Sequence, residues 1–583
     1  MDTTKVTKKR LLIGFLLVLV FSSVITIYLF GGRGFDIHYA IYNSGGDETS
    51  FMSEIKIFLD SGIGYKTEYL GGVFGTDRSG TLSYYLDNDV HFLAYIFAKI
   101  TNNIEEAINL TFISSFFLNG LICYFVLASR KIHPYLSAAG AALYETQFYV
   151  FYRSIGHLML SMIYSIPLEV LLCLWIGEDE EYLAIGKGFF KNKKNIITIL
   201  IIILMVNSGM GYYLYYGCLL IAITGIGKAI KNNRLLEFWQ SLKMGVMTVV
   251  IFLITILPYI LNRLINKTIS IPNIRSITDA ELYSLKIFRL FFPLQMEGVS
   301  AINDKLQEYY EIAYAQSEVS EYLGLVGVIG VVMMAVVLIR GTRDAFKYKD
   351  VKTAALLTIF CILYATIGGL GTVVYLFVMD LARCTNRMSV YICFLCILTI
   401  CTVFDVVIRD NRGKRRQYSR LILVGLICFV LCFLSQWNQE RFNNEEAKLQ
   451  GIEMKTFVSR IEEIENEGSL IYQFPFNNYP SSGYINRMYP DALLLPYLYS
   501  DNLRWSYGSF AGEKSYSINE KIATLNMPDL ARELKKYGFS GVYVDSMGYS
   551  DYELQIMTND FEANGLVEAA VSSSGRWLYY DFE

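Results

Sequence analysis

Long apolar runs separated by polar segments occupy the first 437 residues of this 583-residue chain. The first run, LLIGFLLVLVFSSVITIYLF, follows the basic stretch MDTTKVTKKR and is long enough to cross the hydrocarbon core of a bilayer. No convincing small-residue cleavage site follows it, so we expect an uncleaved span rather than a signal peptide. The further apolar segments are Ala107–Ala128, Pro134–Val150, Leu158–Ile176, Ile196–Val206, Tyr212–Ile226, Val246–Ile265, Tyr322–Ile339, Ala354–Ile367, Val390–Ile408 and Leu421–Leu434. The pattern predicts a polytopic α-helical membrane protein with about eleven transmembrane helices.

The basic residues between these spans predict the orientation of the chain. If the N-terminal Lys and Arg residues are cytoplasmic and successive loops alternate, every basic cluster between spans falls on the cytoplasmic side. The long loops 31–106 and 266–320 and the region after residue 437 then lie outside. We therefore expect a multi-pass protein of the plasma membrane with a cytoplasmic N-terminus.

From Asn438 onward the composition becomes that of a soluble domain. A charged helical stretch precedes the strand-like SLIYQFPF, MPDLARELKKYGFSGVYVDS indicates a helix, a glycine turn and a strand, and LVEAAVSSSGRWLYYDF indicates a hairpin. We expect a transmembrane domain over 1–437 and an extracytoplasmic α/β domain over 438–583. This second domain contains no P-loop, GxGxxG after a strand or GxSxG, so acceptor binding or scaffolding suits it better than a second active site.

Composition agrees with a membrane protein. The chain is 53% hydrophobic and 18% charged, with a mean hydropathy of +0.35, whereas soluble domains are about 45–50% apolar and about 25% charged. The 51 Lys and Arg against 54 Asp and Glu exclude a nucleic-acid binder that relies on a basic surface. Nearly all of the ten cysteines lie in apolar runs, which predicts small buried hydrophobes rather than disulfides or a zinc site.

The first predicted exterior loop, 31–106, holds the densest group of acidic residues. Its candidate residues are Asp47, Glu48, Asp77, Asp87, Asp89 and His91. Such side chains near a bilayer can act as a general base, bind a metal, or hold phosphate through water or a metal. The alternative is a solvated loop in which an acid such as Asp47 only caps a helix. The loop is longer than a connection between two spans requires, which favours a functional role.

Basic side chains also occur on the predicted exterior side, at the ends of spans and, for Lys286, within the loop 266–320; Arg383 and Arg387 break the positive-inside trend. They are Arg153, His157, Lys286, Arg383 and Arg387, with Glu281 and Asn386 nearby. An arginine there can bind an anion such as a lipid phosphate, although snorkelling or anchoring to headgroups is the alternative. Because Glu281, Leu285 and Phe288 share a helical face, this segment predicts an amphipathic helix on the membrane surface. Together the candidates suit an anionic, lipid-linked substrate and a hydroxyl nucleophile that needs a base.

Several stretches along most of the chain carry a resemblance: GDETSF, GGVFGTD, DNDVHF, YRSIGHLMLSMIYSIPL, AELYSLKIFRLFFP, EYLGLVG, RCTNRMSVYI and GFSGVYVDSMGYSD. The chain resembles a bacterial family of polytopic glycosyltransferases or sugar translocases of surface-polysaccharide synthesis. Its architecture is similar to the GT-C superfamily of membrane glycosyltransferases. This resemblance implies transfer from a polyprenyl-phosphate sugar donor to a cell-surface glycan, with inversion at the anomeric centre. By position, Asp47 matches the first-loop base of GT-C enzymes, whereas a second acidic position falls on Asn88, between Asp87 and Asp89.

We therefore expect a GT-C-type hexosyltransferase with Asp47 as the base and Asp77 and Asp89 as helpers. Glu48, His91, Arg153, His157, Glu281, Lys286, Arg383, Asn386 and Arg387 are the expected substrate-binding residues. The pattern demands no cofactor, although a divalent cation would suit its acids. The expected partners are the lipid donor, the glycan acceptor and the bilayer, with no nucleic acid. A lipid-linked sugar transporter or flippase and a non-enzymatic scaffold of envelope assembly are the alternatives.

Overall fold

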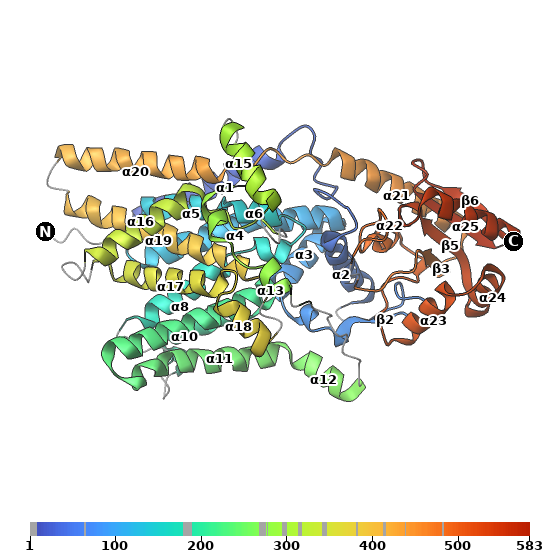
Figure 1. Cartoon of the computed structure of the whole chain (residues 1–583), viewed down its shortest axis with the longest axis horizontal. Helices are drawn as coiled ribbons and strands as arrows, with labels where there is room; N and C mark the ends of the chain where they lie inside the picture. Colours follow the sequence, from blue (N-terminus) through green and yellow to red (C-terminus); the bar gives the residue numbers. More distant parts are fainter. Residues whose placement is uncertain are drawn as a thin grey trace.

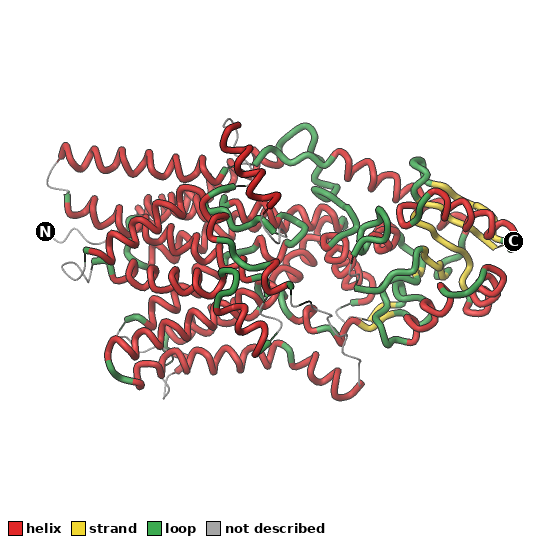
Figure 2. The backbone as a smooth tube through the Cα atoms, in the orientation of Figure 1, coloured by secondary structure: helices red, strands yellow, loops and turns green. Residues whose placement is uncertain are grey.

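The structure is a computed structural model that describes residues 8–62, 66–178, 183, 189–266, 276, 278–293, 300–312, 318–340, 347–379, 383–411, 415–437, 439–480 and 483–582. Figure 1 shows an elongated molecule with the N-terminus at one end and the C-terminus at the other. Helices fill the N-terminal end and the middle, and the strands of the larger sheet gather at the C-terminal end (Figure 2).

Each predicted apolar segment contains a helix. These helices are α1 (Lys8–Phe30), α4 (Ile104–Ser129), α5 (Pro134–Glu145), α8 (Ser165–Ile176), α9 (Lys193–Val206), α10 (Tyr212–Asn232), α11 (Trp239–Thr255), α16 (Gly324–Ile339), α17 (Lys349–Ala365), α19 (Ser389–Asp410) and α20 (Arg415–Gln436). Among the described residues, six helices are long and apolar enough to cross a bilayer, namely α1, α4, α10, α11, α19 and α20. The helices α8 and α16 are apolar but shorter. The protein is therefore a multi-pass membrane protein.

Helix α19 lies at the centre of the bundle. Its residues from Ser389 to Thr402 are all buried, and it packs against α5, α8, α16, α17 and α20. A helix that is apolar on every side is stable only when other helices surround it, and SVYICFLCILTIC meets that condition. The short 3₁₀ helix η7 (Thr385–Met388) leads directly into α19. The best-buried helix of the bundle therefore fixes the position of Asn386 and Arg387.

Two predicted spans are broken in the structure. Segment 134–150 divides into α5 and α6 (Phe148–Arg153), and segment 158–176 divides into α7 (Leu158–Ser161) and α8. Between α6 and α7, the turn 154–157 lies against the first loop, because the Gly156 N–H donates to the Tyr42 Oη at 2.6 Å. A Cβ at Gly156 would lie only 2.6 Å from that oxygen, so this close approach requires glycine. The break places Arg153 and His157 beside the first loop.

The described residues of the first loop, 31–62 and 66–106, form a layer between the bundle and the C-terminal domain (Figure 1). It contains α2 (Asp47–Ser61), the antiparallel strands β1 (Lys66–Thr67) and β2 (Thr76–Asp77), two 3₁₀ turns, and α3 (Asn88–Thr101). Helix α2 packs against α3, α4 and α22 (Leu495–Tyr499). The apolar segment 91–100, which is too short to span a bilayer, lies within α3.

The prediction of a single amphipathic helix around residues 281–288 is wrong. The chain forms two short helices instead, α13 (Asp279–Leu282) and α14 (Ile287–Phe291). Between them Leu285 is extended and pairs with the end of α17, since its N–H donates to the Ala365 carbonyl at 2.8 Å. Backbone pairing with a distant helix end has overridden the helical periodicity. The other helices of this end are α12 (Leu257–Asn266), α15 (Ser300–Ile312) and α18 (Leu370–Phe377).

The C-terminal region folds around a five-stranded sheet in the order β4–β3–β5–β7–β6, in which β4, β3 and β5 are parallel and β7 and β6 are antiparallel. The strands are β3 (Leu470–Phe474), β4 (Arg504–Trp505), β5 (Phe539–Asp545), β6 (Leu566–Val571) and β7 (Trp577–Phe582), and the main helices are α21 (Glu445–Ile464), α23 (Lys514–Ala523), α24 (Met527–Tyr537) and α25 (Asp551–Ala563). Strand β3 is buried throughout, and apolar clusters cover both faces of the sheet. The predicted helix–turn–strand and hairpin are both present.

Backbone hydrogen bonds fasten the C-terminal region to the first loop. The segment after β1 runs beside β4, where the Trp505 N–H donates to the Tyr69 carbonyl at 2.8 Å and the Gly72 N–H donates to the Trp505 carbonyl at 3.0 Å. At the start of α2, the Asp491 N–H donates to the Gly45 carbonyl at 2.8 Å. Gly45 has a φ of 92°, and a Cβ there would lie 2.6 Å from Ala492. The turn that presents Asp47 is therefore built partly on the C-terminal domain.

Candidate active site

Asp47 and His157 meet at the mouth of a small cavity. Asp47 is the first residue of α2, His157 ends the turn after α6, and 3.2 Å separates the Asp47 Oδ2 from the His157 Nε2. The Asp47 side chain is 70% exposed and the His157 side chain 33% exposed. The cavity has a volume of about 160 Å³, and Glu54, Asp87 and His91 also line it. The carboxylate of Asp47 is thus held by protein on one side and open to a ligand on the other.

The surroundings of this pair favour a neutral imidazole. Burial, together with the positive charges of Arg153 and Arg387, lowers the pKa of His157 to about 3. The surrounding protein and the Glu48 carboxylate raise the pKa of Asp47, and Arg387 acts in the opposite direction. His157 is therefore uncharged at neutral pH, and its 3.2 Å contact with Asp47 is not an ion pair. An uncharged neighbour leaves Asp47 its capacity to accept a proton.

A buried cluster of charged residues lies beside the pair. We call it the arginine–glutamate cluster: Arg153, Glu318, Asn386 and Arg387. The Arg153 Nη2 donates to the Glu318 Oε2 at 2.5 Å, the Asn386 Nδ2 donates to the same oxygen at 3.1 Å, and Arg387 lies 3.8 Å from Oε1. Burial alone would raise the pKa of Glu318, but Arg153 and Arg387 hold it well below its usual range. The cluster therefore combines two cations with one anion.

The guanidinium groups of the cluster retain unused donors. The Arg153 side chain is fully buried and that of Arg387 is 6% exposed, yet Nε and Nη1 of both lack a hydrogen-bond partner in the described part of the chain. Arg387 also lies over the Tyr212 ring, with its Cζ 4.0 Å from the ring centroid. Buried N–H groups without partners are costly. An anionic ligand would satisfy them and balance the net positive charge of the cluster.

Other titratable residues of the first loop, Glu54, Asp87 and His91, line the same cavity as Asp47. The His91 Nε2 lies 2.8 Å from the Glu54 Oε2, and the His91 Nδ1 lies 3.0 Å from the Asp87 carbonyl. Asp89 accepts from the Tyr164 hydroxyl and does not line the cavity, whereas Asp87 does. Burial raises the pKa of Asp87 to about 7, with a contribution from Asp89, and burial raises the pKa of Asp89 to about 6. Asp87 and His91 thus form the floor of the cavity.

Two predicted acids serve the fold instead. Glu48 is buried, and its Oε1 accepts hydrogen bonds from the Ser44 N–H at 2.8 Å and the Ser44 hydroxyl at 2.6 Å. It therefore holds the turn that precedes α2. Asp77 lies in strand β2, where Lys66 is 3.3 Å away and the Ser79 N–H donates to its Oδ1 at 3.0 Å. It lines a different cavity, shared with the C-terminal domain, and not the cavity at Asp47.

Three further predicted residues lie around the cluster rather than in it. The Arg383 Nη1 donates to the Asp279 Oδ2 at 2.6 Å. Lys286 is buried with no hydrogen-bond partner for its Nζ in the described ranges, and burial with the nearby charge of Arg289 lowers its pKa to about 8. Glu281 is close enough to raise that pKa slightly. The structure therefore groups Asp47, His157, Arg153, Asn386 and Arg387 and leaves these three at the edge.

Sequence reasoning missed Glu318 and Glu54. Glu318 precedes α16 in a polar stretch with no motif, so no local signal could reveal that it balances two distant arginines. Glu54 was accessible from the sequence, because it lies seven residues after Asp47 and so shares its helical face. For the expected divalent cation, the described residues contain no group of three or more His, Cys, Asp or Glu that could hold a metal ion.

Comparison with solved structures agrees with this architecture. The arabinofuranosyltransferase AftD from Mycobacteria matches with a TM-score of 0.55 at 10% identity, over 99% of this chain and 40% of that one. ArnT from Cupriavidus metallidurans, solved with undecaprenyl phosphate, matches at 10% identity and a TM-score of 0.49 over 97% of both chains. The Archaeoglobus fulgidus oligosaccharyltransferase matches at 10% identity and a TM-score of 0.47, over 92% of this chain and 70% of that one.

The chain therefore has the fold of the GT-C membrane glycosyltransferases. By sequence it belongs to the family described as a domain of unknown function, DUF6311, whose sequence profile matches residues 90–387. The matched region ends at Arg387 and includes Arg153, His157 and Asn386, whereas Asp47 precedes it. The sequence matches no curated protein.

Proposed function

We propose that this protein is a membrane glycosyltransferase that moves a sugar from a polyprenyl-phosphate donor to a glycan acceptor on the outer face of the plasma membrane. One observation carries the proposal. An open carboxylate, Asp47, contacts His157 and lies within electrostatic range of Arg387, and both Arg153 and Arg387 act on His157 and have unpaired guanidinium donors in the described part of the chain. A base next to an anion site is what transfer from a phosphate-linked sugar to a hydroxyl requires. The GT-C fold supports the same class of reaction.

In this proposal Asp47 removes the proton of the acceptor hydroxyl. The hydroxyl oxygen forms a bond to the anomeric carbon, and the bond from that carbon to the phosphate oxygen breaks. The electron pair leaves with the polyprenyl phosphate, and its negative charge is stabilised by the free N–H groups of Arg153 and Arg387. His157 holds the Asp47 carboxylate in place. A single displacement of this kind inverts the configuration of the anomeric carbon.

The proposed orientation places the site outside the cell. Helix α2, which begins at Asp47, lies between the bundle and the C-terminal domain, on the side of the bundle away from the N-terminus (Figure 1). The basic loops predicted to be cytoplasmic include Arg130 and Lys131, which follow α4, and Arg409, which lies near the end of α19. A lipid phosphate at the membrane surface would approach Arg387 while its isoprenoid chain stays among the apolar helices.

The donor class can be tested with a sugar labelled in two chemical forms. Purified protein is added to membranes of cells that lack it, with either a polyprenyl-phosphate sugar or the matching nucleotide sugar. We expect label to enter the surface glycan from the polyprenyl donor alone, since the cluster has a net charge suited to one phosphate. Transfer from the nucleotide sugar by the purified protein contradicts the proposal. Movement of label across sealed vesicles while it stays on the lipid would establish a flippase instead.

The pH dependence of transfer should report Asp47 and not a histidine. Activity requires ionised Asp47, so it falls as pH decreases through a pKa that lies above the usual aspartate value. His157, with a pKa of about 3, stays neutral at the pH of any ordinary assay. We expect kcat/KM, measured from about pH 4 to about pH 8, to show one acidic limb. A limb near pH 6.5 that disappears in His157→Gln would show that His157 titrates during catalysis.

A further inference from the structure

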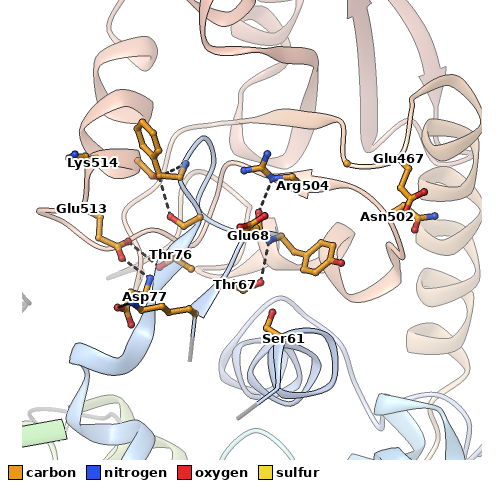
Figure 3. Close-up of a pocket in the computed structure, with 16 residues that line it drawn as sticks. Ser61, Thr67, Glu68, Thr76, Asp77, Glu467, Asn502, Arg504, Glu513 and Lys514 are labelled. Carbon is orange, nitrogen blue, oxygen red and sulfur yellow. Dashed lines mark hydrogen bonds and ion pairs between the residues drawn. The ribbon is translucent and has the colours of Figure 1, made fainter. Parts of the chain in front are cut away.

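A second cavity, larger than the one at Asp47, lies away from that residue. It has a volume of about 1040 Å³ and lies between the first loop and the C-terminal domain (Figure 3). The end of α2 and the β1–β2 hairpin form one side, and the start of β3, strand β4 and the start of α23 form the other. This volume is at the upper end of the range for small-molecule sites. The cavity is therefore large enough for a ligand of several rings.

The walls of this cavity are held rigidly against each other. The Glu513 carboxylate accepts from the Thr76 hydroxyl at 3.0 Å and from the Asp77 N–H at 2.8 Å. The Arg504 Nε donates to the Glu68 carbonyl at 3.1 Å, and the Phe74 N–H donates to the Ser515 hydroxyl at 3.1 Å. Figure 3 shows these contacts crossing between the hairpin and the C-terminal domain. The site is thus preformed, which reduces the entropy lost when a ligand binds.

The cavity lining offers a ligand two carboxylates, an amide and an exposed aromatic ring. The side chains of Glu68, Glu467 and Asn502 make no hydrogen bond within the described residues, and Phe74 is 64% exposed. The Lys514 Nζ lies 6.0 Å from the centre of the Phe74 ring. Carboxylates accept from hydroxyls, an amide both donates and accepts, and an exposed ring offers a flat apolar face. Sugar rings combine hydroxyl edges with apolar faces and match this set.

The charge of the lining argues against a polyanion. The three cations are Lys66, Arg504 and Lys514, and the four anions are Glu68, Asp77, Glu467 and Glu513. A site with more carboxylates than cations repels phosphate-rich or uronic-acid-rich ligands. It differs in this respect from the arginine–glutamate cluster, whose net charge is positive. The two sites therefore suit different parts of a reaction, one anionic and one uncharged.

Helix α2 joins the two sites. Asp47 begins this 15-residue helix and Ser61, which lines the large cavity, ends it. At 1.5 Å per residue the two ends are about 21 Å apart. This is too far for a single sugar ring to occupy both, but an extended oligosaccharide can span it. From this geometry, and resting on the function proposed above, we propose that the cavity binds the distal residues of an uncharged glycan acceptor whose growing end reaches Asp47.

The test measures glycan binding separately from transfer. Full-length protein in nanodiscs is applied to an array of neutral and anionic bacterial oligosaccharides that range from single sugars to long oligomers. The proposal predicts that binding strengthens with oligomer length and that neutral glycans are preferred. Phe74→Ala should weaken binding of the long neutral oligomers about tenfold, and Asn502→Ala should act in the same direction. Tyr552→Ala, which removes an exposed ring from α25 that does not line the cavity, is the matched control.

Each result is decisive for this site. Absence of glycan binding by the wild-type protein, equal binding by Phe74→Ala, or a preference for anionic glycans would overturn the proposal. Asp47→Asn should bind the oligomers as the wild type does, because the cavity lies at the other end of α2. If Asp47→Asn also retains full transfer while Phe74→Ala loses binding, the cavity is a glycan site but the assignment of Asp47 is wrong. Failure of the two proposals can thus be told apart.

Discussion

Replacing Asp47 by asparagine is expected to slow sugar transfer by about 10²–10⁴-fold. The amide has the same shape as the carboxylate, but it cannot accept a proton from the acceptor hydroxyl. Because the Asp47 side chain is 70% exposed, the change leaves no buried charge without a partner and should affect folding little. The measurement is the rate of release of polyprenyl phosphate in membranes that contain the native acceptor.

Donor binding provides the necessary second readout. Asp47→Asn should bind polyprenyl phosphate as tightly as the wild type, or slightly more tightly, since one negative charge near Arg387 is lost. Asp551→Asn, at an exposed position in α25, makes the same chemical change away from the site and should transfer at the wild-type rate. A transfer rate for Asp47→Asn within a few-fold of wild type would remove Asp47 from the mechanism.

Replacing Glu318 by glutamine is expected to destabilise the unliganded protein by about 3–5 kcal/mol. The substitution keeps the shape of the side chain but leaves Arg153 and Arg387 buried without a counter-charge. Polyprenyl phosphate can supply that charge, so it should stabilise this variant more than it stabilises the wild type. The same change should make the variant slow to release its lipid product.

Thermal unfolding in nanodiscs, with and without polyprenyl phosphate, measures both effects. Glu533→Gln is the control, because Glu533 pairs with Lys536 at 2.8 Å on the surface of the C-terminal domain, where an ion pair contributes little. Dephosphorylated polyprenol should stabilise neither variant. Equal stabilisation of Glu318→Gln and wild type by the phosphate lipid would mean that the cluster is structural and does not bind the donor.

The hydrophobic pattern predicts most helices of this protein. It fails to predict the conformation of segments whose backbone is hydrogen-bonded to residues far away in the sequence. The uniformly apolar α19 is predictable because burial on all sides demands an apolar sequence on all sides. Segment 281–288 has a helical pattern, but Leu285 pairs with the end of α17 instead. Likewise Pro134–Val150 is continuous in sequence, but in the structure it divides into α5 and α6 at residues 146–147.

The candidate site was predictable only in part for a related reason. Asp47, Arg153, His157 and Arg387 attract attention individually, as charges at the ends of spans or in a long loop. Their grouping depends on Glu318, which lies far from each of them in sequence and has no pattern of its own. The sequence also cannot tell which of two adjacent acids faces the cavity. In the structure Glu48 accepts hydrogen bonds from the preceding turn, whereas Asp47 contacts His157 at the cavity.

The hydrogen bonds between the first loop and the C-terminal domain restrict how these two parts of the chain can change independently. The Gly45 carbonyl accepts a hydrogen bond from the Asp491 N–H, and residues 69–72 pair with the edge strand β4. More than 400 positions of the chain separate the two members of each pair. Because both contacts are made by the backbone, a chimera that exchanged only the C-terminal residues between two relatives would keep them only if the new domain brought its backbone along the same path. The β1–β2 hairpin, the turn before Asp47 and the C-terminal domain must therefore stay compatible with one another. Two distant stretches of the gene are thus constrained to change together.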